Sequence, residues 1–168
     1  GSGGFELYFE GTEGATFLWD QLMEAGRDLN LRAGAPHQSE RVEAGMLSFL
    51  ADITFDMTPF EAGLGPLCEM ERDIACLGWA ALREKRQPKR QLRPIEIQGG
   101  PLPPHSTFWN VVADGGRVGR ISSSCRAFSF DCNAAIGLID SSHWEPGTAL
   151  EVLTPDGPRA ALVKDKFW

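Results

Sequence analysis

Cysteine and histidine, the residue types that most often do chemistry in proteins, are few in this chain and scattered along it. They are Cys68, Cys76, Cys125 and Cys132, and His37, His105 and His143. No C-x-x-C pair occurs and the histidines lie far apart, so zinc-ligand spacing is absent and no metal is expected. The cysteines lack an evident basic partner, which disfavours a catalytic nucleophile. Each histidine is interpreted as an ordinary surface or packed residue.

Motifs for phosphate binding or acyl transfer are also missing from the sequence. There is no P-loop and no Gly-x-Ser-x-Gly elbow, and Gly63-Leu64-Gly65 is too short to indicate more than a turn after a helix. Residues 83–93 hold six basic residues and one acid. This stretch is typical of a helix end that runs into a solvated linker, with an anion site as the alternative.

Length and composition indicate a globular domain. The chain has 168 residues, of which 42% are hydrophobic and 23% charged, close to one domain's worth. Its net charge of −7 disfavours nucleic acid and anionic membranes as partners. No apolar run of about 18 residues could span a bilayer, and no signal pattern opens the chain. Four reduced thiols are simplest in a cytoplasmic protein.

The elements that must position any site differ between the two halves. Alternation over residues 4–10 predicts a strand whose core face carries Phe5, Leu7 and Phe9. Because this strand begins almost at once, we expect either a tag remnant or a cut within a longer protein. Caps and apolar periodicity predict four helices. They run from a cap at Thr12 to Gly26, from Pro36 to Met46, from a Thr58–Glu61 capping box, and over residues 77–86.

After Pro88 the periodicity changes to short strands separated by turn residues such as Asp114-Gly115-Gly116. The predicted strands cover residues 92–97, 107–112, 117–124, 134–140, 149–153 and 159–164. Six short strands with tight hairpins favour a small antiparallel barrel or a jelly-roll-like sandwich. The predicted fold class is therefore α+β. From the residues alone, nothing beyond a soluble α+β domain is indicated.

Three motifs in order carry a resemblance to a known family. They are Gly4-Phe5-Glu6-Leu7-Tyr8, Arg41-Val42-Glu43-Ala44-Gly45-Met46 and Thr58-Pro59-Phe60-Glu61-Ala62-Gly63-Leu64-Gly65. Together they resemble the folate-dependent family of the glycine-cleavage T-protein, and the resemblance extends over essentially the whole chain. It implies a folate-binding α/β segment, the C-terminal part of that domain, over residues 1–88. A small antiparallel β-barrel is implied over residues 89–168.

Four further segments favour a branch of the family that demethylates dimethylsulfoniopropionate over the T-protein itself. They are Ala35–Arg41, Leu47-Ser48-Phe49, Ser124-Cys125 and Ser142-His143-Trp144-Glu145. The sequence departs from both patterns at Arg126-Ala127-Phe128, where a Ser-Pro turn is usual. The T-protein (aminomethyltransferase) and other folate-dependent demethylases remain alternatives.

The resemblance assigns tetrahydrofolate as cofactor and three binding residues. Glu6 would accept two charge-assisted hydrogen bonds from the pterin amino group and ring N–H. Tyr8, on the same predicted strand face, would contact the ring. Without the resemblance, Glu6 and Tyr8 are a solvated strand face. Arg41 would reach the benzoyl-glutamate carbonyls or carboxylates through its planar fork, and an ion pair with a neighbouring acid is the equal alternative.

The resemblance also implies methyl transfer to tetrahydrofolate, giving 5-methyltetrahydrofolate and 3-methylthiopropanoate. Because a sulfonium releases a neutral thioether, alignment and desolvation would suffice without covalent catalysis. The catalytic residues are unknown and expected upstream, so we expect little turnover without an N-terminal half as partner. The methyl donor is a small molecule. A non-catalytic folate-binding or structural module is the alternative of another class. The oligomeric state stays open, a homodimer included.

Overall fold

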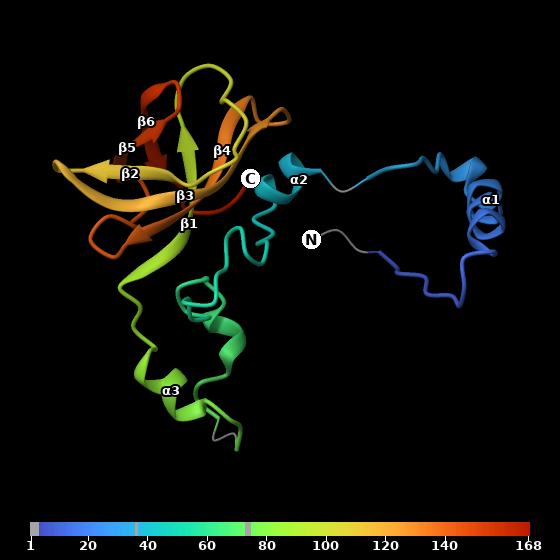
Figure 1. Ribbon diagram of the computed structural model, residues 1–168, viewed down its shortest axis with the longest axis horizontal. Coiled ribbons are helices and arrows are strands. Elements are labelled where there is room, and N and C mark those ends of the chain that lie inside the picture. Colours follow the sequence, from blue (N-terminus) through green and yellow to red (C-terminus); the bar gives the residue numbers. More distant parts are fainter. Residues whose placement is uncertain (1–3, 36, 73–74) are drawn as a thin grey trace. The chain divides into compact units, whose positions relative to one another are not determined.

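The computed structural model describes residues 4–35, 37–72 and 75–168. The chain divides into two compact units, Gly1–Pro36 and His37–Trp168. Most of the second unit is a closed antiparallel barrel with the strand order β1-β4-β3-β2-β5-β6 (Figure 1). Its strands are β1 (Arg90–Ile97), β2 (Trp109–Ala113), β3 (Gly116–Ala127), β4 (Cys132–Asp140), β5 (Ala149–Thr154) and β6 (Gly157–Val163). The predicted α+β class with a small antiparallel barrel is confirmed, and the sandwich alternative is not observed.

Alternation of side chains along the strands fills the barrel interior. One residue in two points inward, and the interior is built from large aliphatic side chains such as Ile95, Ile121 and Ile139, all with no exposed surface. The outer face of β4 is also covered. There Ile136 and Leu138 pack with Val42 into a second apolar cluster. β4 is therefore buried on both faces over most of its length.

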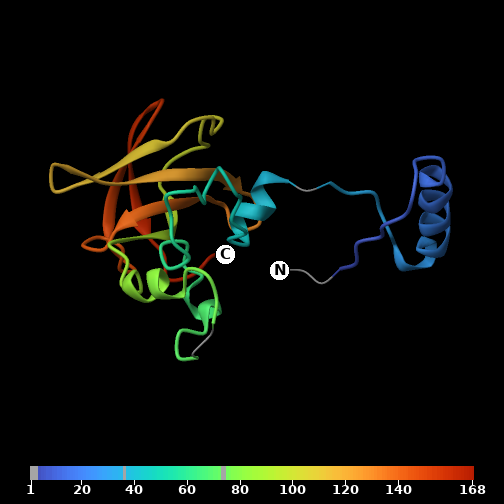
Figure 2. The same cartoon turned by 60° about the horizontal axis from the view of Figure 1, so that its bottom comes forward.

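In the second apolar cluster, residues from the segments before the barrel pack on the outer face of the barrel. Helix α2 (Gln38–Glu43) packs against β3 and β4, as two views agree (Figures 1 and 2). Its N-terminus is capped by His37, whose Nδ1 accepts a hydrogen bond from Ser39 N at 3.2 Å. The chain end returns to the same place, where Trp168 N donates to Glu43 O at 3.0 Å. The predicted helix after Pro36 is thus present and ends three residues earlier than expected.

The helix predicted at Thr58 is wrong, although its capping box forms. Glu61 N donates to Thr58 Oγ1 at 3.2 Å, and Thr58 N donates to Glu61 Oε2 at 2.7 Å. Residues 59–63 nevertheless form turns, and a 3-10 helix follows over Gly65–Cys68. Gly63 at φ +75° diverts the chain before a second helical turn can form. Helix α3 (Trp79–Glu84) fulfils the last helix prediction.

The first unit contains α1 (Ala15–Ala25) and a 3-10 helix over Arg27–Leu29. α1 buries none of its residues, and its N-cap is Gly14 without a side-chain bond, so the predicted cap at Thr12 is wrong. The strand expected over residues 4–10 does not form in the described residues. A strand needs a neighbour for its backbone N–H and C=O groups, and residues 4–35 supply no second strand. The side chain of Phe5 is 99% exposed.

All four cysteines are free thiols. In the residues that the structure describes, no helix combines the length and apolar character needed to cross a membrane. The same residues bring together no cluster of three or more metal-ligating side chains.

Candidate functional site

A buried ion pair between Arg41 of α2 and Asp52 organises the site. Arg41 Nη1 donates to Asp52 Oδ2 at 2.6 Å. The Asp52 side chain has no exposed surface, whereas 19% of the Arg41 side chain remains exposed. A buried ion pair keeps its geometry only when the other donors and acceptors of both groups are also satisfied.

The Arg41 guanidinium is held on three sides. Nη1 also donates to Met46 O at 2.9 Å, Nη2 donates to Ser123 Oγ at 2.7 Å, and Nε donates to Gln38 Oε1 at 3.3 Å. With Asp52, these bonds use four of the five guanidinium N–H groups. One N–H on Nη2 is left without a partner in the described part of the chain.

Gly45 explains how the carbonyl of Met46 reaches Arg41. The chain leaves α2 through Gly45 at φ +67°, and Met46 N bonds back to Arg41 O at 2.8 Å. A Cβ at position 45 would lie 2.3 Å from the Phe167 ring. Only glycine fits both the left-handed backbone and the space, so the Arg-Val-Glu-Ala-Gly-Met sequence encodes the local shape around Arg41.

Asp52 accepts four hydrogen bonds. Ser122 Oγ and Ser123 Oγ donate to its Oδ1 at 2.6 and 2.7 Å. Ser48 N donates to Oδ2 at 2.9 Å beside the Arg41 bond. A buried carboxylate with both oxygens filled in this way is a fixed anchor for the guanidinium.

A β-bulge in β3 lets two consecutive serines reach one carboxylate oxygen. Side chains normally alternate between the faces of a strand. Ile121 pairs with Gly137 and Ser123 pairs with Ile136, so Ser122 is an extra residue in the register. The extra residue turns both hydroxyls to the Asp52 side, as bulges do when they redirect side chains.

A cavity of about 500 Å³ opens beside this network, within the range of ligand pockets. Its walls include Arg41, Ser48, His105, Thr107 and Phe108. They combine a guanidinium, hydroxyls and one aromatic face. This composition suits a flat ligand that carries hydrogen-bond acceptors.

His105 fixes the loop between β1 and β2 at this cavity. Its Nδ1 lies 3.1 Å from Ser124 Oγ, and its ring packs on Trp109 with centroids 4.4 Å apart. Burial lowers the pKa of His105 below its usual value, against a weaker opposing effect from a hydrogen bond to the Ser122 backbone. The imidazole is therefore neutral at pH 7, and its buried Nε2 has no hydrogen-bond partner among the residues that the structure describes.

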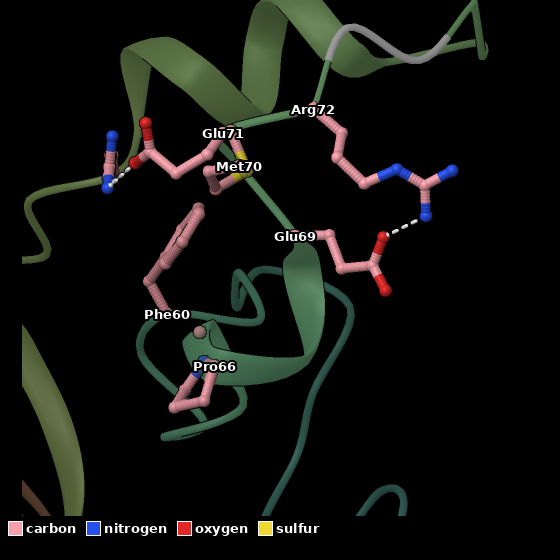
Figure 3. A pocket seen from close by; sticks show the side chains of 8 residues that line it. Phe60, Pro66, Glu69, Met70, Glu71 and Arg72 are labelled. Atoms are coloured by element: carbon pink, nitrogen blue, oxygen red, sulfur yellow. Dashed lines mark hydrogen bonds and ion pairs between the residues drawn. The ribbon is translucent and has the colours of Figure 1, made fainter.

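Another cavity, of about 570 Å³, lies between Phe60 and the segment that ends in Arg72 (Figure 3). Phe60 and Met70 form its apolar part. The charged residues on its rim pair with one another, Arg72 with Glu69 and Arg86 with Glu71. Because these charges are already matched, this cavity offers less to a polar ligand than the one beside Arg41.

The three residues predicted to bind cofactor fall in both units. Glu6 and Tyr8 lie in the first unit with exposed side chains, and the Tyr8 hydroxyl donates to the Glu6 carboxylate. This bond raises the pKa of Tyr8. Arg41 lies in the second unit. Its ion pair with Asp52 agrees with the alternative interpretation of Arg41, an ion pair with an acid. The folate contacts of all three stay predictions.

Sequence reasoning missed Asp52, Ser122, Ser123 and the part that His105 plays. Three successive serines inside a predicted strand are the signal that could have found the first three. A run of small polar residues interrupts the expected alternation, which is how a bulge or a covered outer face looks in sequence. His105 carries no such signal.

Residues 1–72 match the family model of the GCVT N-terminal domain, and residues 90–168 match that of the glycine cleavage T-protein C-terminal barrel domain. The chain therefore belongs to the glycine-cleavage T-protein family, and the predicted resemblance is confirmed.

Among its relatives, the chain is 48% identical over 168 residues to dimethylsulfoniopropionate demethylase DmdA of Ruegeria pomeroyi, covering 99% of this chain and 45% of the relative. It is 31% identical over 169 residues to an aminomethyltransferase of Caldanaerobacter subterraneus subsp. tengcongensis, covering 99% of this chain and 44% of the relative.

A solved structure of glycine cleavage system aminomethyltransferase T from Bartonella henselae is similar, with a TM-score of 0.68 and 25% identity. The match covers 76% of this chain and 36% of that one. The chain thus spans less than half the length of these curated relatives.

Proposed function

We propose that this chain is the C-terminal part of a tetrahydrofolate-dependent demethylase. That enzyme would transfer a methyl group from dimethylsulfoniopropionate to tetrahydrofolate and release 3-methylthiopropanoate and 5-methyltetrahydrofolate. One observation carries the choice of methyl donor. The chain is 48% identical to a dimethylsulfoniopropionate demethylase, against 25% to 32% for the aminomethyltransferases compared with it.

The cavity beside Arg41 fits the benzoyl-glutamate half of the cofactor. Its volume is sufficient, the Phe108 ring supplies an apolar face, and Arg41 has one N–H to donate. Because Asp52 compensates the Arg41 charge, a neutral acceptor suits this donor better than a free carboxylate. We therefore assign Arg41 to the benzoyl carbonyl.

Glu6 is proposed to bind the pterin half. Its carboxylate would accept hydrogen bonds from the pterin amino group and the adjacent ring N–H. Tyr8 donates to one Glu6 oxygen and so restricts the carboxylate's orientation. A hydrogen bond to an ionised carboxylate of this kind contributes about 1.5–3 kcal/mol to the binding free energy.

When bound, tetrahydrofolate supplies the nitrogen nucleophile that accepts the methyl group. The residues of this chain orient that cofactor and exclude water, and we assign none of them a proton transfer. The groups that bind the sulfonium and complete catalysis are expected in the remainder of a protein as long as the relatives. We expect the protein to act in the cytoplasm, since free cysteines persist in reducing compartments.

Two alternatives remain. The structural similarity to an aminomethyltransferase favours glycine-cleavage activity as a second function. A non-catalytic folate-binding or structural module is the third.

The first test is titration of tetrahydrofolate into the purified 168-residue chain and its Glu6→Gln variant. We expect binding that weakens by about 10- to 100-fold in Glu6→Gln, the loss of one charge-assisted bond. Glu10→Gln removes a nearby exposed acid and serves as the matched control, with unchanged affinity. Equal binding by Glu6→Gln and the unmodified chain would reject the assignment of Glu6.

The second test is an assay of the full-length protein. Dimethylsulfoniopropionate and the aminomethyl intermediate of glycine cleavage are offered separately with tetrahydrofolate. Formation of 3-methylthiopropanoate supports the demethylase. Turnover of the aminomethyl intermediate alone identifies an aminomethyltransferase, and no turnover of either supports the module.

A further inference from the structure

A cavity of about 670 Å³ lies beside the first half of strand β1, and this volume is within the range of ligand pockets. β1 pairs with β6 only from Ile95 to Ile97, so on this side its earlier residues have no strand neighbour in the described part of the chain. Two other parts of the chain border this edge. They are residues 45–64 and the C-terminal end, where Lys164 N donates to Pro94 O at 2.8 Å. The cavity lies between them.

Most of the cavity wall is apolar. Leu92 is a buried member of the apolar cluster on the outer face of the barrel. Leu47, Ile53 and Phe167 pack against that cluster and stay partly buried. Leu64 also lines the cavity and is 38% exposed. Such a wall favours an apolar ligand group, because its burial removes apolar surface of both partners from water.

The wall also contains a poorly satisfied guanidinium, that of Arg93 in β1. Its Nε is buried without a hydrogen-bond partner, and its Nη1 makes one long bond, to Gln91 Oε1 at 3.4 Å. Arg93 forms no ion pair with any residue that the structure describes. A partly buried guanidinium with so few partners is costly unless an anion compensates it. Arg93 belongs to the basic stretch over residues 83–93, for which an anion site was the alternative prediction.

The charges in the wall match a single negative charge. Lys166 and Asp165 also line the cavity, and neither forms an ion pair within the described residues. Arg93 and Lys166 against Asp165 leave one net positive charge, which suits a monoanion better than a dianion. A planar guanidinium binds a carboxylate through two parallel hydrogen bonds. A carboxylate with an apolar tail therefore matches both the charged and the apolar parts of the wall.

We propose that this cavity binds an aliphatic monocarboxylate, with its carboxylate on Arg93 and its tail against Leu47, Ile53 and Phe167. The site is separate from the cavity beside Arg41, with which it has no wall residue in common. The inference does not depend on the proposed function, because it needs no folate. The product under that function, 3-methylthiopropanoate, belongs to the same class of ligand.

The first test is calorimetric titration of the 168-residue chain with butanoate and hexanoate at low salt. We expect hexanoate to bind about tenfold more tightly than butanoate, because it buries two more CH₂ groups. Two further probes each lack one part of the ligand. Acetate has the charge without the tail, and 1-hexanol has the tail without the charge. Both should bind at least about tenfold more weakly than hexanoate.

The second test replaces residues of the wall. Arg93→Met removes the guanidinium and keeps an apolar stem. It should weaken hexanoate binding by at least about tenfold without lowering the urea midpoint, because the ligand-free chain loses only a poorly satisfied charge. Leu64→Ala should weaken hexanoate binding about threefold, since it removes apolar wall at a partly exposed position. Asp165→Asn should strengthen it about twofold by removing the opposing charge. Arg32→Gln, an exposed arginine in the first unit, is the matched control and leaves it unchanged.

Three results would overturn the inference. The first is no binding of hexanoate, or binding that Arg93→Met leaves intact or that 1-hexanol equals. The second is a lowered urea midpoint in Arg93→Met, which would make Arg93 a structural residue. The third comes from repeating the titration on the full-length protein. If hexanoate binds the 168-residue chain but not the longer protein, another part of that protein occupies the cavity. None of these results involves folate, so the proposed function stands or falls separately.

Discussion

The barrel and the first unit contain similar kinds of apolar side chain but use them in opposite ways. In the barrel, strands pair in a closed ring and large aliphatic residues such as Ile139 lose all exposed surface. In residues 4–35, Phe5, Trp19 and Leu22 stay 42% to 99% exposed, and no residue of α1 is buried. Burial on the barrel scale supplies most folding free energy, so the second unit carries its own stability and the first does not.

This difference bears on the site because the predicted cofactor residues lie in both units. Arg41 is fixed by four hydrogen bonds in the second unit before any ligand arrives. Glu6 and Tyr8 have only each other as hydrogen-bonding partners among the described residues. A preformed Arg41 costs little conformational entropy on binding, whereas Glu6 must be ordered at that moment. If both residues bind the cofactor as proposed, Arg41 is the more preorganised of the two.

Removing Asp52 is expected to have the largest effect on stability. Asp52→Ala leaves the Arg41 guanidinium without its counter-charge and the Ser123 hydroxyl without its acceptor, whereas the Ser122 hydroxyl keeps only Ile136 O, at 3.2 Å. We expect the free energy of unfolding to fall by about 3–5 kcal/mol, the usual cost of breaking a buried pair, in urea titrations followed by circular dichroism. Asp20→Asn in the exposed α1 is the control, with no measurable loss. A loss below 1 kcal/mol for Asp52→Ala would show that the network does not hold the second unit together.

A pair of core truncations compares the units directly. Ile139→Ala creates a cavity inside the barrel and should cost about 3 kcal/mol. Leu22→Ala in α1, where the side chain is 42% exposed, should cost less than about 0.5 kcal/mol. The same urea titrations measure both variants. Similar losses at the two positions would refute the contrast between the units.

A further pair of variants replaces two threonines, Thr58 and Thr12, that were both predicted to cap helices. Thr58 makes its hydrogen bond with Glu61 N, so Thr58→Ala should cost about 1 kcal/mol. Thr12 does not cap α1, where Gly14 occupies that position, so Thr12→Ala should leave the unfolding midpoint unchanged. A destabilised Thr12→Ala variant would indicate that α1 begins earlier than in this structure.

These threonines also show which features the sequence could predict. The barrel was predictable because alternation and tight-turn residues are local signals, and each strand predicted after Pro88 overlaps an observed one. The capping box at Thr58 was correctly identified as a hydrogen-bond pair. The helix after it was not formed, because Gly63 changes the backbone direction within the same turn.

The strand over residues 4–10 was predicted but does not form, and the Asp52 network was not predicted. Both errors have one cause, which is dependence on distant partners. A strand exists only where another strand pairs with it, and alternation in Phe5, Leu7 and Phe9 says nothing about that partner. Asp52 meets Ser122 and Ser123 from 70 and 71 positions away, through a bulge that adds one residue to the register. Arg41 could be named from its motif, but the acid that it pairs with could not.

The smallest predicted effect is a pH dependence at His105. Burial holds the pKa of His105 below its ordinary value of 6.5, so the folded protein disfavours the proton that the unfolded chain accepts. The stability tied to the neutral imidazole is complete above about pH 6.5 and is lost as the pH falls through the folded pKa. We therefore expect the free energy of unfolding to decrease modestly from pH 7 to pH 5, and less steeply in His105→Gln.

This interval isolates His105 from the carboxylates. Two charged groups act on the His105 ring. The Asp52 carboxylate favours the imidazolium, and the Arg41 guanidinium disfavours it. Glu96 bonded to Lys164 has a lowered pKa, so its contribution is lost only below about pH 4.5. Asn110→Ser changes an exposed residue of β2 that does not titrate, so its slope should equal that of the unmodified chain. If His105→Gln retained the full slope, or if stability rose on acidification, burial of a neutral His105 imidazole would not be the cause of the pH dependence.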